Sequence, residues 1–214
     1  FTLKITPNRA DCLSIKGIAR ETAALTGCTF RQPEIRPIPA ASSKTQPVRI
    51  DAPADCGRFL SRVVENVDAR AATPDWMRQR LERCGIRSVA ALVDIGNYVM
   101  LELGQPMHVY DADRLSGSLT VRHAKEGETL ACLNEKTVTL SADTLVVADE
   151  KGALGIAGLM GGAASAVSAE TRSIVLEAAW FAPETIAGKS RQYGFGSDSS
   201  FRFERGVDTQ IQRD

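Results

Sequence analysis

Residues 84–111, CGIRSVAALVDIGNYVMLELGQPMHVYD, are the stretch that decides the fold. Apolar and small residues recur there every three or four positions, the spacing of one helical face: Val89, Leu92, Val93, Gly96, Val99, Met100 and Leu103. Ser88 suits a helix N-cap, and Gly104 supplies a C-terminal stop. We therefore predict a mostly buried central helix, with Arg87 and His108 just outside its two ends.

The chain before this helix divides by composition. Residues 1–31 hold an alternating, strand-like start and a helical pattern from Ser14 to Gly27. Residues 32–47 contain four prolines and few large apolar groups, which predicts an extended connector. We expect residues 48–208 to form one α+β domain, and residues 209–214 to begin the next segment of a longer chain.

Two strands and a helix are expected between the connector and the central helix. Residues 48–50 and 60–67 have strand-like composition. Thr73 and Pro74 then resemble a cap followed by proline at the first helical position. The buried side of this helix is predicted to carry Trp76, Met77 and Leu81, and its end is predicted at Gly85.

The hydrophobic period changes from helical to two after the central helix. Short β-rich runs alternate with turn residues, which predicts a meander of antiparallel strands; the runs are 118–124, 128–133, 136–140 and 144–149. A glycine-punctuated run follows, and then a buried strand, a helix and a polar loop at 173–181, 183–193 and 194–200. The fold class we predict is α+β, with mixed and antiparallel sheets around the central buried helix and further helices at the periphery.

Composition limits the classes of function. Basic and acidic side chains both number 26, so any contact with nucleic acid must be local rather than a property of the whole surface. The five cysteines are far apart in sequence, which favours reduced thiols in a cytoplasmic protein and predicts no metal site. No apolar run is long enough to span a membrane. The first residue is not Met and the last residues are IQRD, so we expect a piece of a longer protein.

Glu177 is the residue that elementary physics singles out. It stands in IVLEAAW among apolar and small residues, where a carboxylate must face solvent or have a defined partner. An outward glutamate on a strand and a functional glutamate are about equally consistent with this pattern.

Other candidate sites have simple alternatives. A Ser/His/Asp arrangement could use only His108 with Asp111, or His123, and no G-x-S-x-G elbow occurs. Either histidine is more often an ordinary polar residue than a catalyst. GKS at 188–190 resembles the end of a P-loop, but Pro183 stands where that motif needs glycine. The glycine run at 152–162 is either a structural bend or the wall of a substrate pocket, and the loop at 197–205 is either solvated or a rim that contacts anions.

Several long motifs, in this order, resemble the β subunits of bacterial phenylalanyl-tRNA synthetases. They are FTLKITPNRADCLSIKGIARE from residue 1, CGIRS from 84, NYVMLELGQPMHVYD from 97, GLMGG from 158, IVLEAAWF from 174 and SDSSFRFERGVD from 197. The resemblance covers nearly the whole chain. It implies the editing domain of that subunit, which hydrolyses the ester between tRNA(Phe) and a wrongly attached tyrosine. Such a domain acts as a second selective site, because a hydrophobic synthetic pocket for phenylalanine rejects the added hydroxyl of tyrosine poorly.

The resemblance also implies residue roles. Arg87 and His108 match the arginine and histidine near the scissile ester and the tRNA end, and Gly161 matches the glycine wall of the amino-acid pocket. Glu177 matches the glutamate that accepts the tyrosine hydroxyl. Ser197 and Ser199 stand where family members often carry threonine and alanine, and the second change adds an oxygen to a pocket wall.

These roles imply hydrolysis by a positioned water, because the sequence offers no activated nucleophile. The implied partners are tRNA(Phe) and the α subunit in an α2β2 heterotetramer, with no membrane. No cofactor is expected in this part, whereas the parent enzyme uses ATP and Mg. The alternatives are a non-catalytic scaffold or tRNA-docking module, which Ser199 favours, and an unrelated esterase. A helix of about 15 residues spans roughly 22 Å, so Arg87 and His108 can meet one substrate only if the chain folds back after Gly104.

Overall fold

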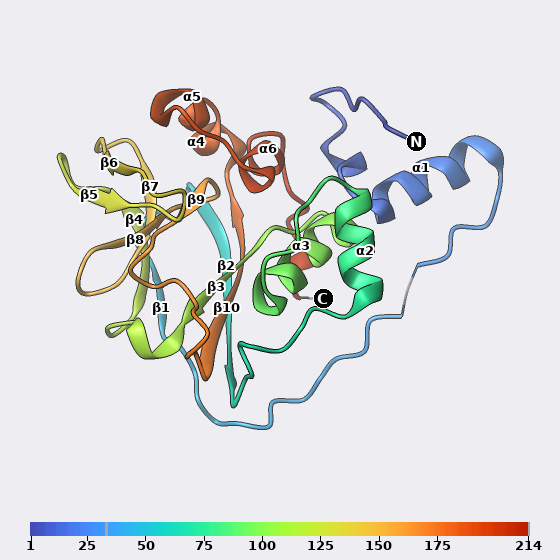
Figure 1. The fold of residues 1–214 in the computed structure, drawn as a ribbon. Coiled ribbons are helices and arrows are strands. Elements are labelled where there is room, and N and C mark those ends of the chain that lie inside the picture. Colours follow the sequence, from blue (N-terminus) through green and yellow to red (C-terminus); the bar gives the residue numbers. More distant parts are fainter. Residues whose placement is uncertain (33, 214) are drawn as a thin grey trace.

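The structure, a computed structural model, describes residues 1–32 and 34–213 and has an α+β fold (Figure 1), as predicted. The helices are α1 (Ile15–Thr26), α2 (Asp75–Arg83), α3 (Ala91–Leu103), α4 (Pro183–Ile186), α5 (Lys189–Tyr193) and α6 (Asp198–Phe203). The strands are β1 (Val48–Ile50), β2 (Cys56–Glu65), β3 (Met107–Asp111), β4 (Leu119–His123), β5 (Thr129–Ala131), β6 (Thr137–Thr139), β7 (Leu145–Ala148), β8 (Ala153–Ile156), β9 (Met160–Gly161) and β10 (Ser173–Phe181). Short 3-10 turns lie at Ala10–Cys12, Ala112–Arg114 and Ile211–Arg213.

Two main sheets organise these strands. One sheet is antiparallel in the order β2-β10-β3, so β10 is its central strand. The other has the order β1-β4-β7-β8-β9 and is mixed, because β1 runs parallel to β4. The four runs predicted as a meander do form antiparallel strands, but β4 pairs with β7 and not with the next strand in sequence. β8 and β9, from the glycine run, extend this antiparallel part of the sheet. The strands β5 and β6 instead pair with each other as a separate hairpin.

The core lies between the two sheets. Alternate residues of β10 point into it, since side chains on a strand alternate between faces, and Val175, Ala179 and Phe181 of this row are buried. They pack in one cluster with side chains from the second sheet, including Val121 and Val147. A smaller cluster lies under the β5–β6 hairpin and contains Leu130, Leu140 and Ile156.

The helix α3 lies against the sheet of β2, β10 and β3 rather than at the centre of the core. It packs with α1, α2 and β3, and Figure 1 shows these three helices on the side of that sheet away from β4–β9. Its residues are mostly half-buried: Met100 is enclosed, but Ile95 is 45% exposed and Val89, before the helix, is 65% exposed. The expectation of a buried central helix therefore holds only in part, because a helix that covers one face of a sheet buries one side.

The ends of the helices differ in detail from the prediction. Ser14 caps α1 by accepting from the Gly17 amide, and Gly27 ends the helix, as expected. The residue before α3 is Ala90, not Ser88. Ser88 instead donates its hydroxyl to Asp94, a fully buried residue of α3.

Four further expectations were wrong in part. Residues 1–5 form no strand. Trp76 is 51% exposed: its ring lies beside α3, 5.2 Å from the Tyr98 ring and 5.3 Å from the Arg80 guanidinium. The helix predicted at 183–193 breaks into α4 and α5 at Gly188, whose φ is 82°. The polar loop at 194–200 is shorter than expected because α6 begins at Asp198.

The division into segments stays a prediction. Residues 34–46 carry no helix or strand, in keeping with an extended connector, while Pro33 of that connector and Asp214 of the last segment lie outside the described residues. All five cysteines are unpaired, as predicted. Within the described ranges, no helix combines the length and apolar character needed to cross a bilayer.

Candidate functional site

The pairing of β3 with β10 brings His108 opposite Glu177. The two residues are register partners in adjacent antiparallel strands, so their side chains share a face of the sheet. Tyr110 lies two residues beyond His108 and therefore on the same face. This face points toward the core, so an imidazole, a phenol and a carboxylate meet between the two sheets.

Glu177 has a buried carboxylate on a central strand. It is 7% exposed and occupies the inward row of β10 between Val175 and Ala179. The Tyr110 hydroxyl donates to its Oε2 atom. Burial raises the pKa of Glu177 to about 7, and the hydrogen bond from Tyr110 acts in the opposite direction. The alternative of an outward, solvated strand glutamate is therefore wrong.

The imidazole of His108 is buried and forms no ion pair within the described residues. Burial lowers the pKa of His108 to about 4, so its ring is neutral at neutral pH. The ring stands edge-on to Tyr110, with 4.5 Å between the ring centroids. Its Nε2 atom has no hydrogen-bond partner in the described part of the chain. Such an atom can bind a water or accept a proton from one.

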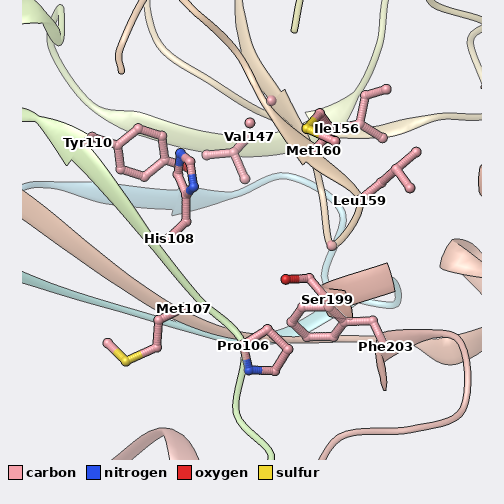
Figure 2. Close-up of a pocket in the computed structure, with 13 residues that line it drawn as sticks. Pro106, Met107, His108, Tyr110, Val147, Ile156, Leu159, Met160, Ser199 and Phe203 are labelled. Atoms are coloured by element: carbon pink, nitrogen blue, oxygen red, sulfur yellow. The ribbon is translucent and has the colours of Figure 1, made fainter. Parts of the chain in front are cut away.

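His108 borders a cavity of about 80 Å³ between the sheets, next to α6. Figure 2 shows its ring on one side of this cavity and Ser199 and Phe203 on another. Strand β9 contacts the imidazole most closely: a Cβ atom added at Gly161 would lie 2.4 Å from His108 Cε1. Gly161 is thus a position where the absence of a side chain lets the backbone approach the ring. Of the two alternatives for the glycine run, a structural bend or a pocket wall, the pocket wall applies at this residue.

The two serines lie at the start of α6. Ser197 is its N-cap: its Oγ accepts from the Ser200 amide and donates to the Leu159 carbonyl at 2.7 Å. Ser197 thereby joins α6 to the turn between β8 and β9. Ser199 lines the cavity itself, and its Oγ lies 3.9 Å from the Met100 sulfur. The extra oxygen of Ser199 relative to alanine is therefore placed in the cavity wall.

A second cavity, of about 200 Å³, lies on the α3 side of β3. It shares Met107 and His108 with the first cavity and is otherwise lined mostly by apolar side chains such as Leu92 and Leu176, with Asn97 among them. His108 therefore stands between an inner and an outer cavity.

Arg87 is a predicted site residue that lies apart from this cluster. The chain does fold back after Gly104, as the sequence required, because Leu92 of α3 and Val109 of β3 border one cavity. Arg87, however, is exposed between α2 and α3 and lines neither cavity that His108 borders. A shared role of Arg87 and His108 at the reacting bond is therefore abandoned.

The other candidates have structural partners. Asp111 accepts from the Thr171 hydroxyl at 2.6 Å and faces away from His108, so the two do not form a dyad. The exposed His123 pairs with Asp55 at 2.9 Å. Lys189 of the GKS sequence donates to Asp143 at 2.7 Å.

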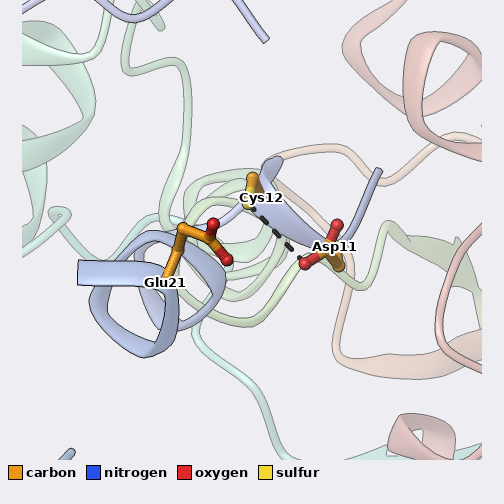
Figure 3. A group of neighbouring side chains, drawn as sticks. All are labelled: Asp11, Cys12 and Glu21. Carbon is orange, nitrogen blue, oxygen red and sulfur yellow. Dashed lines mark hydrogen bonds between the residues drawn. The ribbon is translucent and has the colours of Figure 1, made fainter. Parts of the chain in front are cut away.

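Asp11, Cys12 and Glu21 form a group whose side-chain atoms lie close enough to hold a metal ion (Figure 3). Arg9 already occupies the carboxylates, with its guanidinium 3.0 Å from Asp11 and 2.6 Å from Glu21. Burial raises the pKa of the Cys12 thiol, which favours its protonated, poorly ligating form. We therefore interpret this group as an ion-pair cluster and do not predict that it binds a metal ion.

Tyr110 is the site residue that sequence reasoning missed. A signal was present, because a residue two positions after His108 on a strand shares its face. What the sequence could not show is that the Tyr110 hydroxyl reaches across to Glu177 on the neighbouring strand.

Residues 55–214 match the family model of the B3/4 domain. The chain is 79% identical over all 214 residues to the phenylalanine–tRNA ligase β subunit of Neisseria meningitidis serogroup A, and 56% identical over 214 residues to that of Chromobacterium violaceum. In both cases it spans 27% of the relative's length. A crystal structure of an N-terminal fragment of the phenylalanyl-tRNA synthetase β-subunit from Pyrococcus horikoshii gives a TM-score of 0.49 at 15% identity, covering 84% of this chain and 55% of that one.

Proposed function

The chain belongs to the B3/4 domain family, and from that premise we propose that it is the editing region of a phenylalanyl-tRNA synthetase β subunit. Its substrate is tyrosine wrongly esterified to tRNA(Phe), and its reaction is hydrolysis of that ester. The high identity to phenylalanine–tRNA ligase β subunits supports the assignment to this subunit.

One observation carries the proposal of an editing site. A cavity between the sheets is bordered by the neutral imidazole of His108, whose Nε2 has no partner among the described residues, and by Tyr110. The Tyr110 hydroxyl donates to the buried carboxylate of Glu177. Hydrolysis needs a group that orients a water molecule by accepting a hydrogen bond from it. Selection of tyrosine needs a buried hydrogen-bond acceptor for the tyrosine hydroxyl. The cluster supplies both within one layer of side chains.

The mechanism we propose uses a water molecule as the nucleophile. His108 Nε2 accepts a hydrogen bond from this water, with the ring in the tautomer that carries its proton on Nδ1. Attack forms the new carbon–oxygen bond at the ester carbonyl, and the bond to the terminal ribose oxygen breaks, with the water proton passing to that oxygen. Gly161 fixes the imidazole by close packing, and Glu177 accepts the tyrosine hydroxyl.

Arg87 has a different part in this proposal. Arg87 is an exposed cation next to α3, and we propose that it contacts a phosphate of the bound tRNA. A contact to a phosphate can be made by a solvent-exposed side chain. The parent enzyme attaches phenylalanine to tRNA(Phe) with ATP and Mg and pairs with the α subunit as an α2β2 heterotetramer in the cytoplasm. These properties belong to the parent enzyme, of whose β subunit this chain would be about a quarter.

The alternative is a scaffold or tRNA-docking module without catalysis. The specific observation in its favour is the Ser199 side chain, which occupies part of the inner cavity wall. A scaffold would hydrolyse neither mischarged nor correctly charged tRNA.

The deciding experiment is Glu177→Ala in the whole synthetase, with deacylation of tyrosyl-tRNA and phenylalanyl-tRNA measured side by side. Loss of a hydrogen bond to a charged acceptor costs roughly 1.5–3 kcal/mol, so tyrosyl-tRNA hydrolysis should fall about ten- to a hundredfold. Hydrolysis of phenylalanyl-tRNA should change little, because Tyr110 already partners Glu177 when no substrate hydroxyl is present.

Glu170→Ala is the matched control, since this glutamate is 74% exposed and lines neither cavity that His108 borders. It should leave both rates as in the wild type. Equal losses for both substrates in Glu177→Ala would assign the residue to the fold or the chemistry. An unchanged tyrosyl rate would refute its selective role.

A further inference from the structure

We propose that Tyr110 is a positioning residue for selection of the tyrosine hydroxyl: it holds one oxygen of the Glu177 carboxylate and leaves the other for the substrate. This inference rests on the proposed editing function and adds a second residue to its specificity. Tyr110 does not touch the reacting ester in this scheme and acts through Glu177.

The geometry of the sheet fixes the contact between the two residues. Tyr110 pairs in register with Val175, and Glu177 pairs with His108, so Tyr110 and Glu177 are diagonal neighbours on one face. A diagonal neighbour is within reach of a long aromatic side chain. The Tyr110 hydroxyl donates to Oε2, and both residues are nearly enclosed, at 2% and 7% exposure. Neither side chain can turn away without leaving a polar atom unpaired in the core.

Tyr110 is also the link between Glu177 and the inner cavity. Tyr110 lines that cavity and stands edge-on to His108. In the described part of the chain, Tyr110 is the hydrogen-bond donor to Glu177, and no donor reaches Oε1. An incoming phenol would therefore find one carboxylate oxygen held in place and the other free to accept.

Among the residues that the structure describes, the groups that face Glu177 supply no cation to assist Tyr110. On β3 the neighbouring titratable groups are Tyr110 and His108, and burial keeps the imidazole neutral by lowering the pKa of His108 to about 4. On β2 it is Cys56, whose thiol stays protonated because burial and the nearby Glu177 raise its pKa to about 12. The second sheet faces this layer with apolar residues such as Val121 and Val147. The hydroxyl of Tyr110 is thus what favours the charged form of Glu177.

This arrangement sets the basis of discrimination. With tyrosine in the site, the carboxylate gains a second donor. With phenylalanine, it keeps its bond to Tyr110 and is not left unpaired, so the correct product meets only a modest penalty. Without the Tyr110 hydroxyl, burial would leave Glu177 protonated over more of the neutral range, and a neutral acid accepts a hydrogen bond less strongly than a carboxylate.

The test is Tyr110→Phe in the whole synthetase. The quantity measured is the ratio of kcat/KM for tyrosyl-tRNA to kcat/KM for phenylalanyl-tRNA between pH 6 and 8.5, after subtraction of uncatalysed hydrolysis. In the wild type the ratio should rise through about pH 7, where Glu177 ionises. In Tyr110→Phe the rise should move to higher pH, and the ratio at pH 7 should fall about tenfold, the loss of one ordinary hydrogen bond. The rate with phenylalanyl-tRNA should stay near that of the wild type.

The matched control is Tyr98→Phe, which removes a phenol hydroxyl that bonds Arg80 away from the cavity. It should leave the ratio and its pH profile unchanged. An unchanged profile in a cooperatively melting Tyr110→Phe enzyme would overturn the inference, as would a parallel loss of both substrates at every pH. A wild type that deacylates neither substrate would instead overturn the proposed function, and this inference with it.

Discussion

A carboxylate in the inward row of a central strand is costly unless a donor meets it. Glu177 occupies such a position, and the donor it meets is the Tyr110 hydroxyl, not a lysine or arginine. A neutral donor reduces the free-energy penalty of burying the charged carboxylate but does not remove it. The pKa of Glu177 therefore stays raised, at about 7. A residue held in this state can change its charge near neutral pH, and that suits recognition of a hydroxyl.

Gly161→Ala tests the close packing against the imidazole. The added Cβ would lie 2.4 Å from His108 Cε1 and 3.0 Å from its Nε2, so the ring must move. A shift of about 1 Å in a positioning group can cost about a hundredfold in rate, and we expect a loss of that order for tyrosyl-tRNA deacylation. Steady-state deacylation by the whole synthetase measures it.

Gly196→Ala is the control for Gly161→Ala, because its added Cβ would come no closer than 3.4 Å to the Ser190 side chain. It should retain the wild-type rate. A fully active Gly161→Ala enzyme would show that this position of the His108 ring is not needed for hydrolysis.

At the scale of elements, the start of α3 is anchored by Asp94. This carboxylate is fully buried and accepts from the Ser88 and Thr73 hydroxyls and, at 3.0 Å, from the Val89 amide. It therefore ties the segment before α2 and the segment before α3 to the helix itself. At the start of a helix, a side-chain oxygen of the residue before the helix usually accepts from the free backbone amides. Here the accepting oxygen belongs to Asp94, a residue inside the helix, and the amide belongs to Val89, before it.

Asp94→Ala should therefore destabilise the chain. It leaves the two hydroxyls and the Val89 amide without their acceptor, and we expect a loss of about 2–4 kcal/mol in the free energy of unfolding. Denaturant unfolding of the chain measures this loss. Asp113→Ala, at an exposed position, should change stability by no more than about 0.5 kcal/mol. Equal effects of the two substitutions would contradict the anchoring role.

At the scale of the whole molecule, the layer between the two sheets contains two groups whose charged forms are disfavoured. The pKa of Glu177 rises from 4.5 to about 7, so its contribution to stability is full below pH 4.5 and is lost as pH rises toward 7. The pKa of His108 falls from 6.5 to about 4, so its contribution is full above pH 6.5 and is lost as pH falls toward 4. Between pH 4.5 and 6.5 the two effects oppose each other.

Glu177→Gln separates these two effects. The amide cannot ionise but can still accept from Tyr110, so the variant should gain stability over the wild type as pH rises from 4.5 to 7. The gain should level off above pH 7 at no more than about 3 kcal/mol. Unfolding free energies of both proteins at pH 5, 6, 7 and 8 test this. A difference between the two proteins that does not vary with pH would refute the burial of an ionisable Glu177.

The sequence by itself determined the elements and the residue types of the candidate site. Periods of two and 3.6 predicted the strands β4–β7 and β10 and the helices α1 and α2, because local burial patterns follow the geometry of each element. The apolar surroundings of Glu177 marked it as a residue that needs a partner. The motifs around His108 and Gly161 indicated the family, and the match over residues 55–214 confirms it.

The tertiary structure alone decided which of these residues meet. His108, Tyr110 and Glu177 come together because β3 and β10, more than 60 residues apart in sequence, pair in one register, and a shift of one residue would place them on opposite faces. The exposed position of Arg87 and the half-burial of α3 also depend on which face of the sheet the helices cover. Local periodicity contains no information on long-range register, since register is fixed by the packing of both sheets against each other.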